Sequence, residues 1–448
     1  MSMSASISFP WNAVVALLVA LATAFYYHHK RSEAQRKESI EQARAAARRS
    51  NQQQEEAHQE RLRQQEDRAK KRNKRKNKPG DTPHDPSRHP HYVRRFGGHH
   101  GSVTGMSVSP NGEWVATCDT DGQLRVARAE RSRHTADMFV AARASEPLDH
   151  VCWEGDNRTL ACATRRTQEV TFYRVRGKKD SASRGFPYEL VELAKRRFPT
   201  RERLDAATSL VTDRSSSSYH LVLTGGHAVA GGSNNIVVAW DGSGVPDHFL
   251  ASLSIGCPGD VRLSHDGKFL CGRAAGAGKE VKVFEVVKKR HKGEAEPRFE
   301  RITKAMSLYV GKDVADVDFL YDGGGTCVRA LVACADGNFQ VWNLAVEYRR
   351  GEDPALLRAC SPLPAAPGDG DVVEAVATSH RNRRVVVATE GSTLHAFTCA
   401  DDGGIVHDCT IENCHGPRGV AADLQFDREG TTVYTRGRLS KDVFSWKV

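Results

Sequence analysis

The chain has 448 residues, and its 65 Lys and Arg exceed its 55 Asp and Glu to give a formal net charge of +10. Residues 28–95 hold 20 basic and 10 acidic side chains, so residues 96–448 carry 45 of each, which excludes a basic character for that part. The 11 cysteines are an odd number without close spacing, which excludes a disulfide scaffold and indicates buried thiols in a reducing compartment such as the cytosol.

The first predicted element is a transmembrane helix over residues 7–27, a run of 21 uncharged residues. As a helix it would be about 31 Å long, against a hydrocarbon thickness of about 30 Å. Lys30 and Arg31 follow it, so the positive-inside rule predicts that the rest of the chain lies in the cytosol. The residues expected to hold this anchor in the bilayer are Trp11, Leu17, Leu18, Leu21, Phe25, Tyr26 and Tyr27.

A cleaved signal peptide is the alternative for this segment, because Ala22-Thr23-Ala24 resembles a signal-peptidase site. Signal peptides begin with a basic n-region, whereas residues 1–27 contain no Lys or Arg. A strongly basic segment also follows the supposed cleavage point. Both observations favour an uncleaved anchor.

Residues 28–90 are predicted to form a basic, charged stalk and linker, helical or disordered. Glu33 and Lys37, like Glu66 and Lys70, have the i,i+4 order that supports a solvent-exposed helix. Large aliphatic residues are nearly absent, so the segment offers no hydrophobic seam for a coiled coil.

The stalk ends in a basic patch with three interpretations: a nuclear signal, a contact with anionic lipid or RNA, or a solvated run. A solvated face is the simplest of these. A weak ribosome or RNA contact ranks second, since phosphate binding releases counterions but no aromatic side chains interleave to stack on bases. The patch comprises Lys70, Lys71, Arg72, Lys74, Arg75, Lys76 and Lys78.

From residue 91 to the end, the chain changes to short alternating apolar runs separated by tight turns. Seven such runs end at or near an aromatic position, and only the third keeps a Trp-Asp pair. This pattern predicts an all-β fold, a seven-bladed WD40 β-propeller over residues 91–448. The runs are residues 124–127, 170–173, 237–240, 281–284, 339–342, 394–397 and 443–446, and the residues expected in the repeat core are Trp240, Asp241, Phe284, Trp342, Phe397 and Trp446.

Local sequence signals position the strands around these runs. Ser109-Pro110-Asn111-Gly112 is expected to be a hairpin turn inside a blade, and Gly98-His99 stands where a WD40 blade begins. Because the chain ends two residues after Trp446, the last blade is expected to take its outer strand from residues 91–96, closing the ring. The longest insertion is expected between Val175 and Tyr219.

The order of anchor, basic segment and seven degenerate repeats resembles the transducin beta-like 2 family of membrane-anchored WD40 proteins. The closest local matches are residues 102–112, residues 281–286, and residues 346–350 with 353–357 after Trp342. The resemblance implies a protein of the endoplasmic reticulum membrane that acts through contacts with other proteins.

No set of residues has the pattern of a catalytic, cofactor or metal site, so we predict that the chain is not an enzyme and holds no cofactor. His407, Cys409, Cys414 and His415 have ligand chemistry, but their spacing fits no standard zinc site. Packing between blades is the expected role of these residues.

These observations together predict a single-pass scaffold of the endoplasmic reticulum whose propeller faces the cytosol and binds proteins that the sequence does not name. We expect a monomer or a subunit of a hetero-complex. The alternatives are a nucleotide-exchange factor for a small GTPase and a ribosome or RNA tether acting through the basic patch. The single glycosylation sequon, Asn157-Arg158-Thr159, is expected to stay unmodified in the cytosol.

Overall fold

The computed structural model describes residues 86–448 with internal gaps, so the predicted anchor and the basic patch lie outside the described residues. Among the described residues, no helix is long and apolar enough to cross a membrane. Side chains are not described for residues 138–141, 196–197, 206–254, 288–289 and 298–302. The gaps are residues 131–137, 165–168, 178–187, 198–205, 213–218, 226–227, 230–231, 234–235, 242–248, 255–260, 274–277, 290–297, 303–305, 347–351, 364–371 and 417–418.

The described chain is all-β apart from the short 3-10 helix η1 (Pro86–Arg88), and its strands form seven successive antiparallel sheets. We number these sheets as blades 1–7. Blades 1–3 contain, from the inner strand outwards, β2 (Val103–Val108), β3 (Trp114–Asp119), β4 (Gln123–Arg128) and β5 (Met138–Arg143); β6 (Leu148–Trp153), β7 (Thr159–Thr164), β8 (Glu169–Gly177) and β9 (Tyr188–Arg197); and β10 (Ala206–Thr212), β11 (Tyr219–Gly225), β14 (Ile236–Asp241) and β15 (Phe249–Ser254).

The second half of the ring repeats this order with one variation in blade 4. Blades 4–6 contain β16 (Val261–Leu263), β17 (Phe269–Arg273), β18 (Glu280–Lys289) and β19 (Arg298–Ile302) with β20 (Met306–Tyr309); β21 (Val314–Tyr321), β22 (Cys327–Cys334), β23 (Phe339–Asn343) and β24 (Ala355–Cys360); and β25 (Val373–Thr378), β26 (Arg384–Thr389), β27 (Thr393–Cys399) and β28 (Ile405–Ile411). Blade 7 contains β29 (Ala421–Phe426), β30 (Thr432–Gly437), β31 (Val443–Lys447) and β1 (Tyr92–Phe96).

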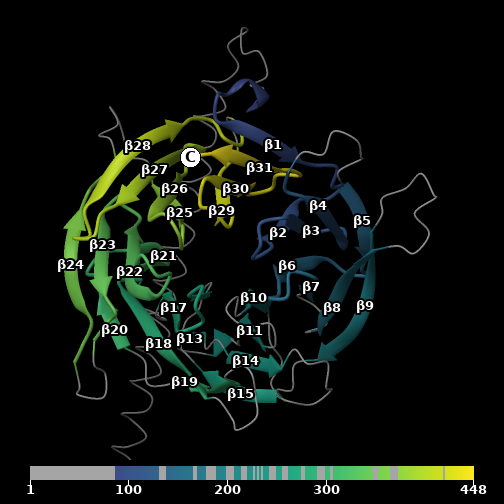
Figure 1. Cartoon of the computed structure of the whole chain (residues 1–448), viewed down its shortest axis with the longest axis horizontal. Helices are drawn as coiled ribbons and strands as arrows, with labels where there is room; N and C mark the ends of the chain where they lie inside the picture. The colour runs from purple at the N-terminus through teal and green to yellow at the C-terminus, as the bar shows by residue number, and fades with distance from the viewer. Residues whose placement is uncertain are drawn as a thin grey trace, which may run out of the picture. The chain divides into compact units, whose positions relative to one another are not determined.

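Neighbouring blades touch through their first and second strands, and the contacts run all the way round. Strand β2 contacts β6, β6 contacts β10, β10 contacts β16, β17 contacts β21, β21 contacts β25, and β25 contacts β29. Strand β29 contacts β2 again, so blade 7 lies beside blade 1 (Figure 1). The seven blades therefore form a closed ring.

The last blade is completed by the first strand of the described chain. Strand β1 pairs antiparallel with β31, with Tyr92 opposite Trp446 and Phe96 opposite Val443. Phe96 is fully buried, whereas Val93 is 46% exposed, so β1 packs against the blade by one face only. The pairing covers the edge of β31 that would otherwise be open.

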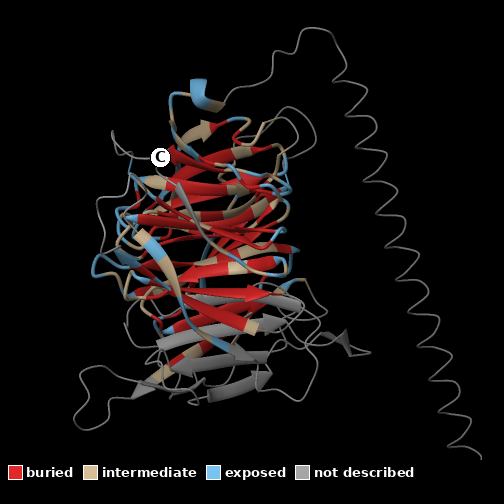
Figure 2. Cartoon of the chain, turned by 90° about the vertical axis from the view of Figure 1, so that its right-hand side faces the viewer, coloured by how far each residue is buried: buried red, intermediate tan, exposed pale blue. Residues whose placement is uncertain are grey.

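In the blades whose side chains the structure describes, the core lies on the second and third strands, and Figure 2 shows the interior of these blades as mostly buried. All six residues of β3 and of β7 are buried, as expected for strands packed on both faces. The expected core thiols Cys118, Cys162 and Cys271 are each 0% exposed and free. Of the expected repeat-core residues, Phe284, Trp342, Phe397 and Trp446 are buried, and Ala127 is buried where an aromatic is missing. The side chains of Trp240 and Asp241 are not described.

The structure adds two details to the expected strand order. The span between Val175 and Tyr219, where the longest insertion was expected, holds β9 and β10, the outer strand of one blade and the inner strand of the next. Its residues 178–187, 198–205 and 213–218 lie outside the described residues. A two-stranded hairpin, β12 (Ala228–Val229) with β13 (Gly232–Ser233), lies inside blade 3, and β18 pairs with two short outer strands. Alternating polarity did not reveal these pieces because each is only two to five residues long.

Candidate functional site

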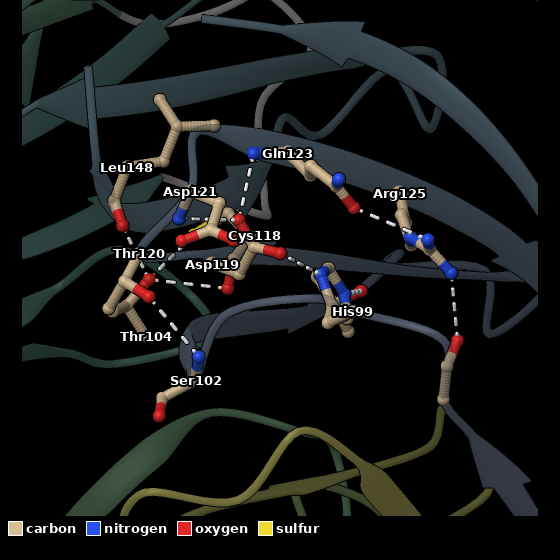
Figure 3. Close-up of polar contacts among 12 residues, drawn as sticks. His99, Ser102, Thr104, Cys118, Asp119, Thr120, Asp121, Gln123, Arg125 and Leu148 are labelled. Carbon is tan, nitrogen blue, oxygen red and sulfur yellow. Dashed lines mark hydrogen bonds and ion pairs between the residues drawn. The ribbon is translucent and has the colours of Figure 1, made fainter.

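A chain of hydrogen bonds in blade 1 has the geometry of a hydrolase triad. His99 Nδ1 lies 2.8 Å from Asp119 Oδ2 (Figure 3). On the other side of the ring, His99 Nε2 lies 2.7 Å from Thr117 Oγ1. Because the carboxylate only accepts, Nδ1 carries the proton, and the Thr117 hydroxyl then donates to Nε2. Thr117, His99 and Asp119 thus take the positions of nucleophile, base and orienting acid.

Burial prevents this triad-like set from acting as a catalyst. The side chains of His99 and Asp119 are 0% exposed, and Thr117 is 2% exposed. Burial lowers the pKa of His99, although the hydrogen bond and the charge of Asp119 oppose the shift. A substrate carbonyl has no route to Thr117 Oγ1. The set therefore ties the segment before β2 to β3, where the network stabilises blade 1.

The same carboxylate also shapes the turn between β3 and β4. Asp119 Oδ1 accepts hydrogen bonds from the backbone N–H groups of Asp121, at 2.9 Å, and Gln123, at 2.8 Å. Arg125 extends the network, since its Nη1 donates to Gly97 O at 3.0 Å and its Nη2 to Gln123 Oε1 at 3.3 Å. One buried carboxylate therefore fixes both the entry to blade 1 and a turn within it.

Blade 7 has a counterpart that lacks the carboxylate. His415 Nε2 lies 2.9 Å from Thr435 Oγ1, and Trp446 Nε1 donates to the same hydroxyl at 3.0 Å. The strand register places Gly437 where blade 1 has Asp119, so His415 Nδ1 is buried without a hydrogen-bond partner among the described residues. Blade 1 keeps the Asp and lacks the Trp, while blade 7 keeps the Trp and lacks the Asp.

The inner strands enclose a central cavity of about 230 Å³ lined mainly by polar groups. Polar side chains here connect one blade to the next. Gln425 in blade 7 accepts from Val108 N and donates to Met106 O in blade 1, both at 3.0 Å. Asp316 in blade 5 accepts from Arg262 of blade 4 at 2.8 Å and from Val376 N of blade 6 at 2.9 Å.

Two of the residues that line this cavity are stacked histidines. The rings of His265, from blade 4, and His380, from blade 6, stack at 3.8 Å with 17° between their planes. Tyr321 of blade 5 lies edge-on to both, and its hydroxyl accepts a hydrogen bond from His265 N at 2.7 Å. Three blades are thereby joined at this point. The cavity-lining groups described so far act as connectors between blades.

Three thiols of the described residues have pKa values that make them unsuited to nucleophilic chemistry. Burial raises the pKa of Cys118 to about 12, of Cys334 to about 11 and of Cys414 to about 12. A thiol that stays protonated at neutral pH is a poor nucleophile and a poor metal ligand.

The four residues weighed as zinc ligands are engaged separately. His407 Nε2 lies 2.9 Å from Thr410 Oγ1 on the exposed outer strand β28, whereas Cys414 Sγ contacts Ser392 Oγ in the buried interior. His415 belongs to the blade 7 network, and Cys409 is half-buried. In the part of the chain that the structure describes, no three His, Cys, Asp or Glu side chains are grouped to hold a metal ion.

Exposed apolar side chains gather on the outer strands and loops instead. Strand β24 exposes Leu356 (47%) and Leu357 (45%), and five of its six residues are exposed. It pairs only with β23, so its outer edge is open among the described residues. Further exposed apolar residues are Val406, Tyr309, Leu439 and Leu193. These exposed residues could not be predicted from the sequence, because an outer strand and a core strand can share the same short apolar run.

Comparison with known proteins agrees with this geometry. Residues 90–126 match the family model described as WD domain, G-beta repeat. The matched residues include the Gly98-His99 pair at the start of blade 1, Thr117 and Asp119, and the turn between β3 and β4. Residues 90–126 therefore match a WD40 repeat within the seven-bladed ring. The matched residues contain the His-Asp-Thr network of blade 1, which is complete, whereas that of blade 7 lacks its carboxylate.

Whole-chain comparisons extend beyond that repeat. The chain is similar to transducin beta-like protein 2 of Homo sapiens, 23% identical over 352 residues that cover 77% of this chain and 70% of that protein. It is 24% identical to the Mus musculus protein of the same name over 368 residues, 80% and 72% of the two chains. A solved structure described as "Structure of U3-55K" has a TM-score of 0.53 and 14% identity, covering 80% of this chain and 98% of that chain. That likeness shows the propeller fold alone.

Proposed function

We propose that this WD40 protein is a non-enzymatic scaffold, anchored in the endoplasmic reticulum membrane by residues 7–27, that presents its propeller to cytosolic partner proteins. Support for the anchor comes from 21 uncharged residues followed by Lys30 and Arg31. Support for the compartment comes from free buried cysteines and from the similarity to transducin beta-like protein 2.

The observation that supports the proposal is that polar side chains are bonded inside the ring, whereas exposed apolar side chains lie on its outer strands. Side chains with catalytic chemistry, such as His99, Asp119 and Asp316, are bonded within or between blades. Apolar groups available to a partner lie on the outside, above all Leu356 and Leu357 on the open edge of β24. Interfaces combine an apolar centre with a polar rim, and here Arg358 and Asp402 form an exposed ion pair of 3.1 Å beside the two leucines.

Proximity labelling from the full chain tests the scaffold. We expect a reproducible set of cytosolic proteins to be labelled, and we expect Leu356→Asp with Leu357→Asp to remove at least one of them. Leu193→Asp, at an equally exposed leucine on β9, is the matched control and is expected to leave the set unchanged. If the full chain labels no protein beyond a membrane-anchored control, the scaffold proposal fails.

A further inference from the structure

The turn between β30 and β31 in blade 7 holds a leucine in a conformation that leucine disfavours. Ser440 N donates to Gly437 O at 3.2 Å, which closes a β-turn with Leu439 as its third residue. Leu439 has φ 64°, in the left-handed region that Gly and Asn tolerate best. In the corresponding turns of blades 1 and 5 the left-handed residue is a glycine, Gly122 or Gly337. Among the described non-glycine residues with a positive φ, Leu439 is the only apolar one.

Packing within the propeller does not explain this choice of residue. Leu439 is 82% exposed, the largest exposed fraction among the large hydrophobic residues that the structure describes. The side chain therefore gains little burial to offset the cost of its backbone conformation. A residue that breaks a local rule without a gain inside the fold is typical of a functional position.

The backbone of the turn is fixed on both sides of the leucine. Arg438 N donates to Val420 O at 2.6 Å, just before β29, and Val103 N of blade 1 donates to Ser440 O at 2.8 Å. The Ser440 hydroxyl donates to Asp442 O at 3.0 Å and accepts from Asp442 N at 3.1 Å. Leu439 is thus presented in one set position, which lowers the entropy cost of binding through it.

The solvent side of this turn is basic. Two ion pairs flank it, and in each pair the arginine lies outside and the carboxylate beneath. The exposed fractions are 61% for Arg438 against 21% for Glu374, and 59% for Arg95 against 17% for Asp442. Lys441 in the same turn is also exposed. The surface around the leucine therefore matches an acidic surface on a partner.

The position of the turn favours a protein over a bilayer as that partner. Strand β1 starts at Tyr92 and ends at Phe96, which pairs with Val443 at the start of β31. Leu439 comes just before Val443, so it lies at the end of blade 7 where β1 ends. Residues 28–90 join the propeller at the other end of β1, and the leucine is therefore on the side away from the tether to the predicted anchor.

We propose that Leu439 is the anchor residue of a protein-binding surface, which inserts into an apolar pocket whose carboxylate rim meets Arg438 and Lys441. A central apolar anchor with a charged rim is the common anatomy of such interfaces. The surface belongs to another blade than Leu356 and Leu357. The inference rests on the proposed scaffold role and deepens it by naming a second surface and the chemistry of its partner.

Leu439→Asn in the full chain separates binding from folding. Asn tolerates the left-handed region, so we expect the melting temperature to rise by about 1–2 °C while binding through this surface is lost. A lower melting temperature would show that the leucine stabilises the propeller, and would overturn the proposal.

A photoreactive side chain at the same position identifies what the leucine touches. We expect Leu439→p-benzoyl-phenylalanine, in the full chain in intact cells, to give a discrete protein adduct. The matched control is Val93→p-benzoyl-phenylalanine, at a 46% exposed position on β1, which is expected not to give that adduct. Adducts confined to phospholipid, or the same adducts at both positions, would refute a protein partner for Leu439.

The adducted protein, once purified, tests the chemistry of the contact. We expect the natural chain to bind it at least about tenfold more tightly than the Leu439→Asn and Lys441→Glu variants do. Equal affinities for the natural chain and both variants would overturn the proposal. If no protein adduct forms while labelling that depends on Leu356 and Leu357 persists, this inference fails and the scaffold stands.

Discussion

His415, at the residue scale, sets a dependence of stability on pH. Burial, reinforced by the charge of Arg436, lowers its pKa from 6.5 to about 3. The unfolded chain binds the proton more readily, so stability is lost as the pH falls from about 6.5 towards 3. Between pH 6.5 and 5 the loss from this residue is about 2 kcal/mol.

Chemical unfolding at these two pH values measures that loss. His415→Gln keeps a nitrogen that reaches towards Thr435 but does not titrate, so we expect its free energy of unfolding to vary less over this range. Equal pH dependence of the free energy of unfolding in the variant and in the natural chain would contradict the assignment to His415.

Glu154 acts in the opposite direction. It is 4% exposed, and burial, followed by the charge of Asp156, raises its pKa from 4.5 to about 9, although Arg174 and Thr159 oppose the shift. The folded protein therefore keeps a proton that the unfolded chain has lost, and stability declines as the pH rises from about 4.5 to about 9.

Glu154→Gln removes this titration while keeping the shape of the side chain. We expect the variant to be more stable than the natural chain at pH 8, by on the order of 3 kcal/mol, and the difference to vanish near pH 4. Denaturant unfolding at both pH values checks this. A variant that is less stable at pH 8 would show that Glu154 is ionised in the folded protein.

At the element scale, the closing strand β1 completes blade 7 by pairing with β31. Phe96 is the one fully buried side chain of β1, and its ring centroid lies 5.8 Å from that of Tyr434. Val93, on the other face of the strand, is 46% exposed. We expect Phe96→Ala to cost about 3–5 kcal/mol and Val93→Ala less than about 0.5 kcal/mol. Thermal unfolding of the two variants measures the difference.

Deleting residues 91–96 removes the whole closing strand. We expect this deletion to destabilise every blade, and an unchanged thermal unfolding transition would contradict that expectation.

Elements differ in how far the sequence predicted them. The third strand of each blade was indicated by its short, largely apolar run, from residues 124–127 to 443–446. Strands that pack on both faces carry apolar residues on both, so such a run is readable in the sequence itself. The split outer strand β19 and β20 and the hairpin β12–β13 were missed. Outer strands are half-solvated, so their sequences are less constrained by the core.

On the scale of the whole molecule, the predicted anchor can be tested by substitutions that leave the propeller unchanged. Leu17→Asp, Leu18→Asp and Leu21→Asp together place three charges in residues 7–27, each costing about 2.5–3.5 kcal/mol near the centre of a bilayer. We expect the triple variant to be released from membranes by alkaline carbonate while the natural chain stays bound. Lys74→Gln with Lys76→Gln is the control, and it is expected to stay with the membrane fraction. If the triple variant stayed in the membrane fraction, the prediction that residues 7–27 anchor the chain would be wrong.

Periodic burial and the position of the last apolar run were enough to predict the all-β repeat, its seven blades and the origin of the closing strand. The Gly-His pair also placed His99 at the start of blade 1. Tertiary packing alone brings Thr117 and Asp119 to His99 out of solvent, leaves His415 without a carboxylate, and brings the Asn157 amide to another blade. Periodic burial is a local property of each strand, whereas a hydrogen bond between turns 46 residues apart exists only once two blades have packed together.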